Sequence, residues 1–365
     1  MRVLVVAGIT GGHIYPGIAI ANEIRLKNKN AVIEFVGVEG CMEDRVVPLE
    51  GYKVNHIKAA GFEKYSLKLK VKAFFEIFTG LSDAFKIINE FKPDIVIGMG
   101  SFITASMVWA GWLKKVPSIV HEQNAYPGRA IKAVAPFASK IIISFESSKK
   151  YFSRKLHEKI ILTGNPVRKE FDAYSKEIAR KTLRIKDNEK IILCIGGSLG
   201  AKKINNAAIE LAEKLHSSTD IKIIIVTGRK QYDEVTESVG TKIYKNIELL
   251  PYADNMPVLL NACDLVICRG GATTLFENMT TGTPGIYIPY PYASADHQRE
   301  NINYITSHGG GLMIEDDQLS GDRLYEKVSG IIFDEKKLQQ MSVNAKNAAP
   351  ENVLENFYRE IIKII

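Results

Sequence analysis

RVLVVAGITGGH at residues 2–13 is an apolar, β-branched run that ends in a glycine loop, and KIILCIGGSLG at residues 190–200 repeats that design. A second pair follows the same rule, because PDIVIGMGS at 93–101 and CDLVICRGG at 263–271 each lead through a helix-like segment to another short strand. Alternation of such runs with amphipathic segments is typical of βαβ units around a parallel sheet. We therefore expect the α/β class, with two Rossmann-like domains in tandem rather than one large sheet.

The length of the chain supports two domains. At 365 residues it exceeds the size at which a single hydrophobic core usually stops growing. The turn-forming Gly164-Asn165-Pro166 interrupts the pattern, so we predict one domain over 1–163 and a second over 164–340. Because open α/β sheets bind ligands beyond the carboxyl ends of their strands, we expect the site in a cleft between the two domains.

Composition narrows the class of protein. With 46% apolar and 24% charged residues, the chain is that of a globular protein rather than a disordered one. Its four scattered cysteines show neither the pairing of a zinc site nor the density of a disulfide scaffold, so we expect reduced thiols and no metal. No run approaches the roughly 20 apolar residues that span a bilayer, and Met1 leads directly into a strand, which predicts a cytoplasmic location.

The net charge of +7 allows attraction to anionic lipid, nucleic acid or a phosphorylated ligand. Residues 62–78 read FEKYSLKLKVKAFFEIF, in which lysines alternate with leucine, valine and phenylalanine. That mixture suits an anionic membrane surface, although an ordinary amphipathic stretch with a buried aromatic face has the same pattern. No recognisable reading module accompanies the basic charge, so we expect no nucleic-acid partner.

The first glycine loop, Gly8–His13, leads into a helix, whose free N–H groups and dipole favour an anion. It lacks the Gly-Lys-Ser or Gly-Lys-Thr of a Walker loop, and no loop of the chain carries G-x-G-x-x-G, so hydride transfer is disfavoured. Two separate glycine loops favour a ligand held from both domains, with structural turns as the alternative. His13 is a candidate general base because imidazole titrates near neutrality; a histidine that only packs at the helix start is the other interpretation.

The second half offers groups for a nucleotide. RGGATTLFE at 269–277 runs from a strand end through glycines into a helix, where the Glu277 carboxylate can accept hydrogen bonds from ribose hydroxyls. Arg168 and Ser198 can bind a diphosphate, although a linker arginine is more often solvated. The polar run around Gln298 suits sugar hydroxyls. No spaced metal ligands, Ser-His-Asp set or Cys-His pair stands out.

Six motifs occur in order along nearly the whole chain. They are Thr10-Gly-Gly-His13 with Pro16, His121-Glu-Gln-Asn124, Gly164-Asn-Pro-Val-Arg168, Gly196-Gly-Ser198, Arg269 with Glu277, and Asp296-His-Gln298. In this set and order the chain resembles the MurG family of peptidoglycan synthesis, the undecaprenyldiphospho-muramoylpentapeptide β-N-acetylglucosaminyltransferases. The resemblance implies a GT-B fold whose final helix, about 341–365, returns to the first domain.

The resemblance also implies an activity. The donor is UDP-N-acetylglucosamine, the acceptor is the C4 hydroxyl of the lipid-linked muramoyl-pentapeptide, and the anomeric carbon is inverted without a cofactor. We expect the enzyme to be peripheral, at the cytoplasmic face of the cell membrane.

By the same resemblance His13 is the base, and Asn124 contacts the sugar or the acceptor. The residues implied at the donor sugar and diphosphate are Thr10, Gly11, Gly12, Arg168, Ser198 and Gln298. Those implied at the nucleoside are Ala253, through its backbone to uracil, and the helix Ala272, Thr273, Thr274, Leu275, Phe276 and Glu277, with Glu277 on the ribose.

Several positions depart from the family pattern. Ile9 stands where the first loop usually has glycine, Leu199 where the second has glutamine, and Gly270 where serine is usual. Gly98–Ser106 departs further, since the family usually shows Gly-Gly-Tyr and then Ser-Gly-Pro on this acceptor side.

Three alternatives therefore remain. The first is a related GT-B enzyme that uses a UDP-sugar with another lipid-linked acceptor. The second is a UDP-N-acetylglucosamine 2-epimerase, which should lack the His-Glu-Gln-Asn and Gly-Asn-Pro-Val-Arg motifs. The third is a non-catalytic, nucleotide-sugar-binding membrane scaffold, which would not need His13.

Overall fold

The structure is a computed structural model that describes residues 1–57, 80–197, 200–240 and 246–365. The chain forms two compact units, Met1–Arg168 with Pro350–Ile365, and Lys169–Ala349. The basic, aromatic stretch 62–78 and the candidate residue Ser198 lie outside the described residues.

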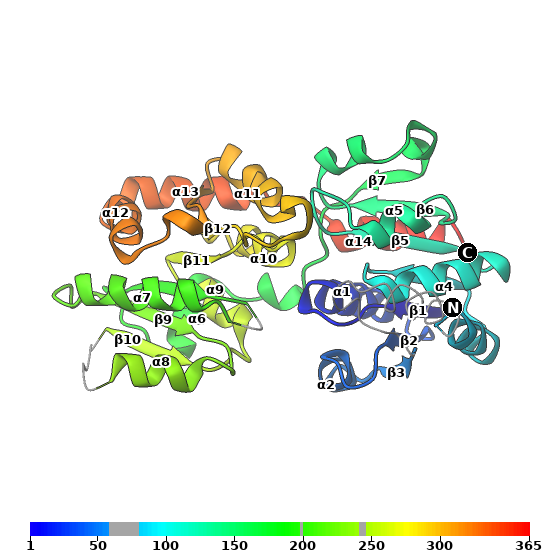
Figure 1. Ribbon diagram of the computed structural model, residues 1–365, viewed down its shortest axis with the longest axis horizontal. Coiled ribbons are helices and arrows are strands. Elements are labelled where there is room, and N and C mark those ends of the chain that lie inside the picture. Colours follow the sequence, from blue (N-terminus) through cyan, green and yellow to red (C-terminus); the bar gives the residue numbers. More distant parts are fainter. Residues whose placement is uncertain (58–79, 198–199, 241–245) are drawn as a thin grey trace, which may run out of the picture. The chain divides into compact units, whose positions relative to one another are not determined.

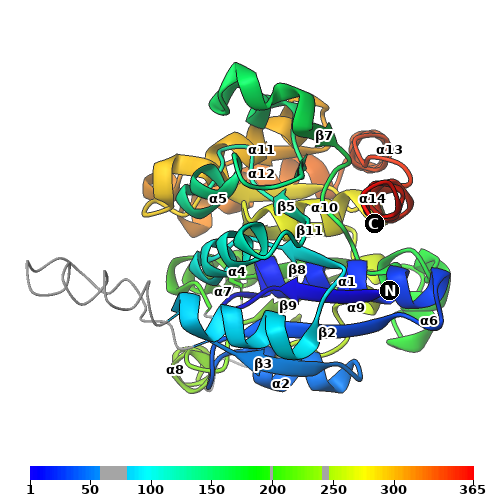
Figure 2. The ribbon, with the colours of Figure 1, turned by 90° about the vertical axis from the view of Figure 1, so that its right-hand side faces the viewer.

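The first unit is built on a seven-stranded sheet in the order β3-β2-β1-β4-β5-β6-β7, with every pair parallel (Figure 1). The strands are β1 (Arg2–Val6), β2 (Val32–Gly37), β3 (Lys53–His56), β4 (Ile95–Gly98), β5 (Ser118–Glu122), β6 (Lys140–Ile143) and β7 (Ile160–Leu162). β1 is an interior strand, because Val5 pairs with Phe35 of β2 and with Ile97 of β4, and β2 lies beside β3 (Figure 2). From β1 to β3 successive strands are added on one side of β1, and from β4 to β7 they are added on its other side. Doubly wound sheets bind ligands at this change of strand order, between β1 and β4.

Helices cover both faces of this sheet. They are α1 (Gly11–Lys27), α2 (Glu43–Leu49), a helix over 80–91, α4 (Phe102–Leu113), α5 (Arg129–Val134) and α14 (Val353–Ile362), with 3-10 turns η1 (Glu146–Tyr151) and η2 (Arg154–Lys159). Phe357 and Ile361 of α14 share a buried core with Ile14 and Ile18 of α1. The helix over 80–91 and α4 pack on the opposite face, in the core that contains Leu4.

The C-terminal segment 341–365 is two helices where the sequence predicted one. α13 (Glu335–Asn347) belongs to the second unit, and α14 belongs to the first. Pro350 lies between them, and a proline cannot donate the backbone hydrogen bond that a continuous helix needs.

The second unit has a six-stranded sheet in the order β10-β9-β8-β11-β12-β13, again with every pair parallel. The strands are β8 (Lys190–Ile195), β9 (Ile221–Val226), β10 (Ile247–Leu250), β11 (Leu265–Arg269), β12 (Gly285–Ile288) and β13 (Gly311–Met313). The α-helices besides α13 are α6 (Lys176–Thr182), α7 (Lys202–Lys214), α8 (Tyr232–Val239), α9 (Met256–Ala262), α10 (Ala272–Thr281), α11 (His297–Ser307) and α12 (Gly321–Ile332). The 3-10 turns are η3 (Lys169–Phe171), η4 (Ser294–Asp296) and η5 (Asp316–Gln318).

Both faces of this second sheet are buried. Ile192 and Cys194 pack in one core with α7 and α12, while the intervening Leu193 is fully buried toward the other face. Strands buried on both faces read as continuous apolar runs, which is why KIILCI carries no alternation. The prediction of an α/β protein with two Rossmann-like parallel sheets is confirmed. Within the described ranges, no helix is long and apolar enough to cross a membrane.

Candidate functional site

A buried carboxylate shapes the loop that follows β1. Glu43, the first residue of α2, is fully buried, and its two oxygens accept the Ile9 N–H at 2.8 Å and the Val38 N–H at 2.7 Å. Ile9 has a φ of 78°, a left-handed conformation that β-branched residues rarely adopt. A Cβ at Gly8 would lie 2.5 Å from Glu43 Oε1, so that position requires glycine. No sequence signal marks Glu43, because its role depends on two loops that come together only in the fold.

His13 lies between the loops that follow β1 and β4. Its Nδ1 is 3.2 Å from Thr10 Oγ1, and a Cβ at Gly100 would come within 2.8 Å of its Cδ2 and Nε2. Removal of the ring from water lowers the pKa of His13 to about 4, although a hydrogen bond with the Gly8 backbone opposes the shift. The imidazole is therefore neutral at pH 7. A base at Nε2 requires that Nδ1 keep its hydrogen, which Thr10 Oγ1 can accept.

Gln123 braces the loop on the other side of His13. Its Nε2 donates to the Met99 carbonyl at 2.7 Å and lies 3.0 Å from His121 Nδ1. Its Oε1 is 3.4 Å from the position of a Cβ at Gly100, directly beside the imidazole. The His-Glu-Gln-Asn motif was predicted to contribute only Asn124, but its buried glutamine supports the turn that faces His13.

Glu122 holds the loop that carries Asn124. Its carboxylate accepts the Asn124 N–H at 2.9 Å, the Asn124 side-chain amide at 3.2 Å and the Gly128 N–H at 2.8 Å. Burial raises the pKa of Glu122 to about 7, against the effect of these hydrogen bonds. Asn124 is the second residue after β5, so it lies at the same carboxyl edge of the sheet as His13.

Arg168 ends the first unit and lies near the start of α1. Its guanidinium is 4.5 Å from the centroid of the Tyr15 ring, and Tyr15 Cε2 is 3.1 Å from the position of a Cβ at Gly11. The cation is thus held close to Thr10, Gly11 and Gly12, whose backbone begins the helix. A guanidinium beside a helix N-terminus is a suitable environment for an anion.

Gln298 connects two loops at the carboxyl edge of the second sheet. Its Oε1 accepts the Gly270 N–H at 3.1 Å and the Tyr290 N–H at 3.0 Å, which leaves the amide nitrogen as the group that can donate to a sugar. A Cβ at Gly270 would lie 2.6 Å from the Ile302 side chain, so the serine usual in the family has no room here. A Cβ at the next residue, Gly271, would meet nothing within 4 Å.

The residues predicted on the nucleotide helix lie on α10 in two groups. Leu275 and Phe276 are 0% and 2% exposed and belong to the interior, whereas Thr273 and Thr274 are partly exposed. Glu277 is 9% exposed, in the second turn of the helix. Ala253 follows β10, next to Tyr252, whose ring lies 4.9 Å from the Arg229 guanidinium carbon.

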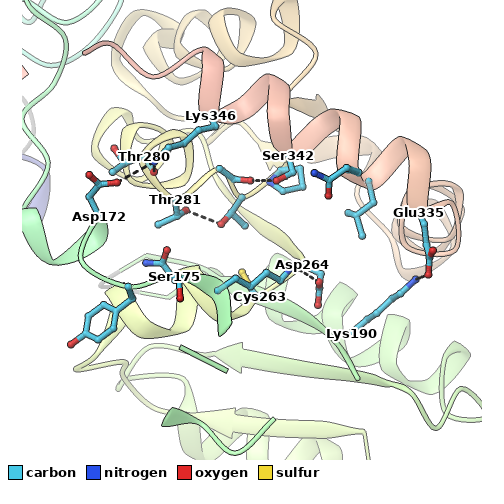
Figure 3. Close-up of a pocket in the computed structure, with 18 residues that line it drawn as sticks. Asp172, Ser175, Lys190, Cys263, Asp264, Thr280, Thr281, Glu335, Ser342 and Lys346 are labelled. Carbon is cyan, nitrogen blue, oxygen red and sulfur yellow. Dashed lines mark hydrogen bonds and ion pairs between the residues drawn. The ribbon is translucent and has the colours of Figure 1, made fainter. Parts of the chain in front are cut away.

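The second unit also has a cavity of about 610 Å³ where β8, β11 and β12 begin, at the opposite edge of the sheet (Figure 3). Its charged residues pair with one another, for example Lys176 with Asp264 at 2.6 Å and Lys346 with Asp172 at 3.1 Å. None of the described candidate residues lines it. Among the described residues, no group of histidine, cysteine and carboxylate side chains could hold a metal ion.

Two family models match the chain. Residues 3–143 match the glycosyltransferase family 28 N-terminal domain, and residues 191–357 match the glycosyltransferase family 28 C-terminal domain. Curated relatives align over the full chain. Proteins of Alkaliphilus metalliredigens (37% identical, all of both chains) and Acetivibrio thermocellus (39% identical, 98% of the relative) are both named UDP-N-acetylglucosamine–N-acetylmuramyl-(pentapeptide) pyrophosphoryl-undecaprenol N-acetylglucosamine transferase.

Solved structures agree on the fold. Acinetobacter baumannii MurG matches with a TM-score of 0.77 at 23% identity over 99% of both chains, which gives the GT-B fold. A Neisseria meningitidis UDP-GlcNAc 2-epimerase matches with a TM-score of 0.68 at 17% identity over all of both chains. At such identities the likeness concerns architecture alone, and it does not by itself separate a transferase from an epimerase.

Proposed function

The chain belongs to the family of N-acetylmuramyl-(pentapeptide) pyrophosphoryl-undecaprenol N-acetylglucosamine transferases, and from that premise we propose that it transfers N-acetylglucosamine from UDP-N-acetylglucosamine to the lipid-linked muramyl-pentapeptide. The observation that carries this function is 37–39% identity to such transferases over the full chain. The reaction builds the disaccharide lipid precursor of peptidoglycan.

His13 is the proposed base. The C4 hydroxyl of the acceptor attacks the anomeric carbon while the bond to the UDP oxygen breaks, and the hydroxyl proton passes to Nε2 of His13. A neutral imidazole whose other nitrogen lies 3.2 Å from Thr10 Oγ1 supports this role. Because attack and departure occur on opposite faces of the sugar, the anomeric configuration inverts.

The negative charge that develops on UDP needs positive potential. Arg168, beside the N-terminus of α1, is the proposed cation, and the N-terminus of α10 is a second favourable position for an anion. Glu277 is proposed to accept hydrogen bonds from the ribose, Ala253 to contact uracil through its backbone, and Gln298 to donate to the sugar. Ser198 remains a predicted diphosphate ligand.

The test is transfer of labelled N-acetylglucosamine from its UDP donor to a short-chain analogue of the lipid-linked muramyl-pentapeptide. His13→Ala should lower kcat by about 10²–10⁴-fold, as loss of a general base does, and should leave UDP affinity nearly unchanged. Near-normal turnover would remove His13 from this role. No product from the unmodified protein despite tight UDP-sugar binding would instead assign it another acceptor.

The donor site has its own test. Glu277→Ala should weaken UDP binding, measured by titration calorimetry, because the ribose loses a charge-assisted hydrogen bond acceptor. The matched control is Glu335→Ala, which removes an exposed carboxylate from the cavity at the opposite edge of the same sheet. Unchanged UDP affinity in Glu277→Ala would refute the assignment.

We also propose that the enzyme docks on the anionic, cytoplasmic face of the membrane. The described residues add support at the end of α4, where Trp112 and Leu113 are 52% and 55% exposed and Lys114 and Lys115 follow. Lys114 Nζ lies 5.7 Å from the centroid of the Phe85 ring. Phe85 belongs to the helix over 80–91, which comes after the basic stretch 62–78 in the chain. Exposed aromatic and basic side chains together suit a lipid interface.

Cosedimentation with vesicles tests this docking. Reversing the charge of Lys68, Lys70 and Lys72, or changing Trp112 to serine, should reduce binding to phosphatidylglycerol vesicles, and added salt should reduce binding of the unmodified protein. Charge reversal at the exposed Lys186 of the second unit is the control. Equal binding by all variants would leave the stretch as an ordinary amphipathic segment.

A further inference from the structure

The loop that follows β9 lies between two parts of the candidate donor site. In the second sheet β9 is flanked by β8 and β10, and all three strands are parallel, so their carboxyl ends share one edge. The glycine loop with the predicted diphosphate ligand Ser198 follows β8, and Ala253, the predicted uracil contact, follows β10. Residues 227–231 follow β9 and belong to none of the six sequence motifs.

Asn205 and Gln231 join this loop to the glycine loop. Asn205, in the first turn of α7, is fully buried, and its Nδ2 donates to the Thr227 carbonyl at 3.0 Å and to Gln231 Oε1 at 2.8 Å. Gly200, with φ 78°, is packed against the same two residues, because a Cβ there would overlap the Thr227 carbonyl oxygen and lie 3.0 Å from Gln231 Nε2. The end of the glycine loop is therefore held against the loop after β9.

Two contacts join the same loop to the chain after β10. Thr227, which is fully buried, donates its N–H to the carbonyl of Leu250, the last residue of β10, at 2.9 Å. Further along the loop, the Arg229 guanidinium carbon lies 4.9 Å from the centroid of the Tyr252 ring. Tyr252 directly precedes Ala253 in the chain. Arg229 therefore holds the residue next to the predicted uracil contact.

The core of the second unit does not depend on either of these two loop side chains. Arg229 is exposed and Gln231 is half-buried, whereas the core consists of apolar side chains from the strands and helices. Substitution of such surface residues usually changes stability little. What their contacts fix is the separation of two loops that would bind opposite ends of one nucleotide.

We propose that Gln231 and Arg229 are positioning residues for the donor nucleotide. Gln231 holds the glycine loop in the conformation that binds the diphosphate, and Arg229 holds the Tyr252–Ala253 segment in place to contact uracil. Neither side chain needs to touch the ligand, because each acts through a backbone segment that does. This inference rests on the proposed function, since it takes Ser198 and Ala253 as contacts of UDP.

The two roles predict different losses of affinity, which NMR titration with UDP, CDP and uridine separates. Gln231→Ala removes an acceptor for Asn205, so the Kd for UDP should rise about 3–10-fold while the Kd for uridine, which has no phosphate, changes less than about twofold. Arg229→Ala removes the cation from the Tyr252 ring, so the Kd values for UDP and uridine should rise by the same factor of about 2–5, and the preference for UDP over CDP should fall. Arg229→Lys keeps a cation and should restore most of the affinity.

The matched control is Lys230→Ala, because Lys230 is an exposed residue of the same loop, between the two changed positions. This variant should leave all three Kd values within about twofold of those of the unmodified protein. Equal losses for UDP and uridine in Gln231→Ala, or an unchanged preference for UDP over CDP in Arg229→Ala, would overturn the corresponding role. A loss in Lys230→Ala as large as in its neighbours would overturn both roles.

The unmodified protein distinguishes failure of this inference from failure of the proposed function. If it binds UDP no better than CDP, the assignment of the donor fails before any variant is compared. If it prefers UDP, unchanged Kd values in both variants overturn the positioning roles while the donor assignment stands. Because these titrations contain no acceptor, their result does not depend on whether the muramyl-pentapeptide lipid is the acceptor.

Discussion

Removal of the Glu43 carboxylate should both destabilise the first unit and loosen the loop beside His13. In Glu43→Ala the N–H groups of Ile9 and Val38 lose their acceptor inside the protein. Each buried donor left unsatisfied costs about 1–3 kcal/mol, which sums to about 2–6 kcal/mol. Relaxation of the left-handed Ile9 returns roughly 1–2 kcal/mol. The expected net loss in the free energy of unfolding is therefore about 2.5 kcal/mol, within limits of roughly 0–5 kcal/mol.

Urea unfolding followed by circular dichroism measures this loss, and hydrogen exchange of peptides covering residues 5–11 locates it. Glu43→Gln should lose about half as much, because one acceptor oxygen remains. The control is Glu39→Ala, which removes an exposed carboxylate from the turn after β2 and should stay within about 0.5 kcal/mol of the unmodified protein. A Glu43→Ala protein with unchanged stability and unchanged exchange at Ile9 would refute the view that Glu43 holds this loop.

Three further predictions follow from the same site. Proton NMR should give His13 a pKa of about 4. Between pH 4 and 6.5 the unfolded chain binds a proton at this histidine and the folded chain does not, so His13 should make the free energy of unfolding rise with pH over that range. A measured pKa of about 6 or higher would contradict this. Glu122 has a pKa of about 7 in the folded state. Between pH 4.5 and 7 the folded chain keeps a proton that the unfolded chain loses, so the free energy of unfolding should fall as the pH rises through this range. Glu122→Gln should make that decrease smaller when unfolding is measured across the same range. Gly100→Ala, whose Cβ would lie 2.8 Å from the His13 ring, should lower kcat at least about tenfold and stability by about 1–3 kcal/mol. Gly40→Ala, also at positive φ but with nothing within 4 Å of its Cβ, should lose stability alone, and equal kcat losses in both would disprove the contact with His13.

The order of elements was readable from the chain because it depends on local pattern. Apolar runs that end in glycine loops mark β1, β4, β8 and β11, which are strands of parallel sheets buried on both faces. The α/β class, the two sheets and the loop that carries His13 follow from that pattern. The final segment was the exception, since Pro350 divides it between the two units.

The amino-acid sequence by itself determined the fold class, the family, and which loops carry polar groups, because those properties reside in motifs a few residues long. Only the tertiary structure decided how the loops are held. Three buried side chains hold backbone groups that the fold brings to them, and they are Glu43, Glu122 and Gln123. No local sequence pattern predicts these contacts. The left-handed backbone at Ile9 and Ser101 likewise arises only in the fold, where the loops after the neighbouring strands β1 and β4 meet around the His13 imidazole.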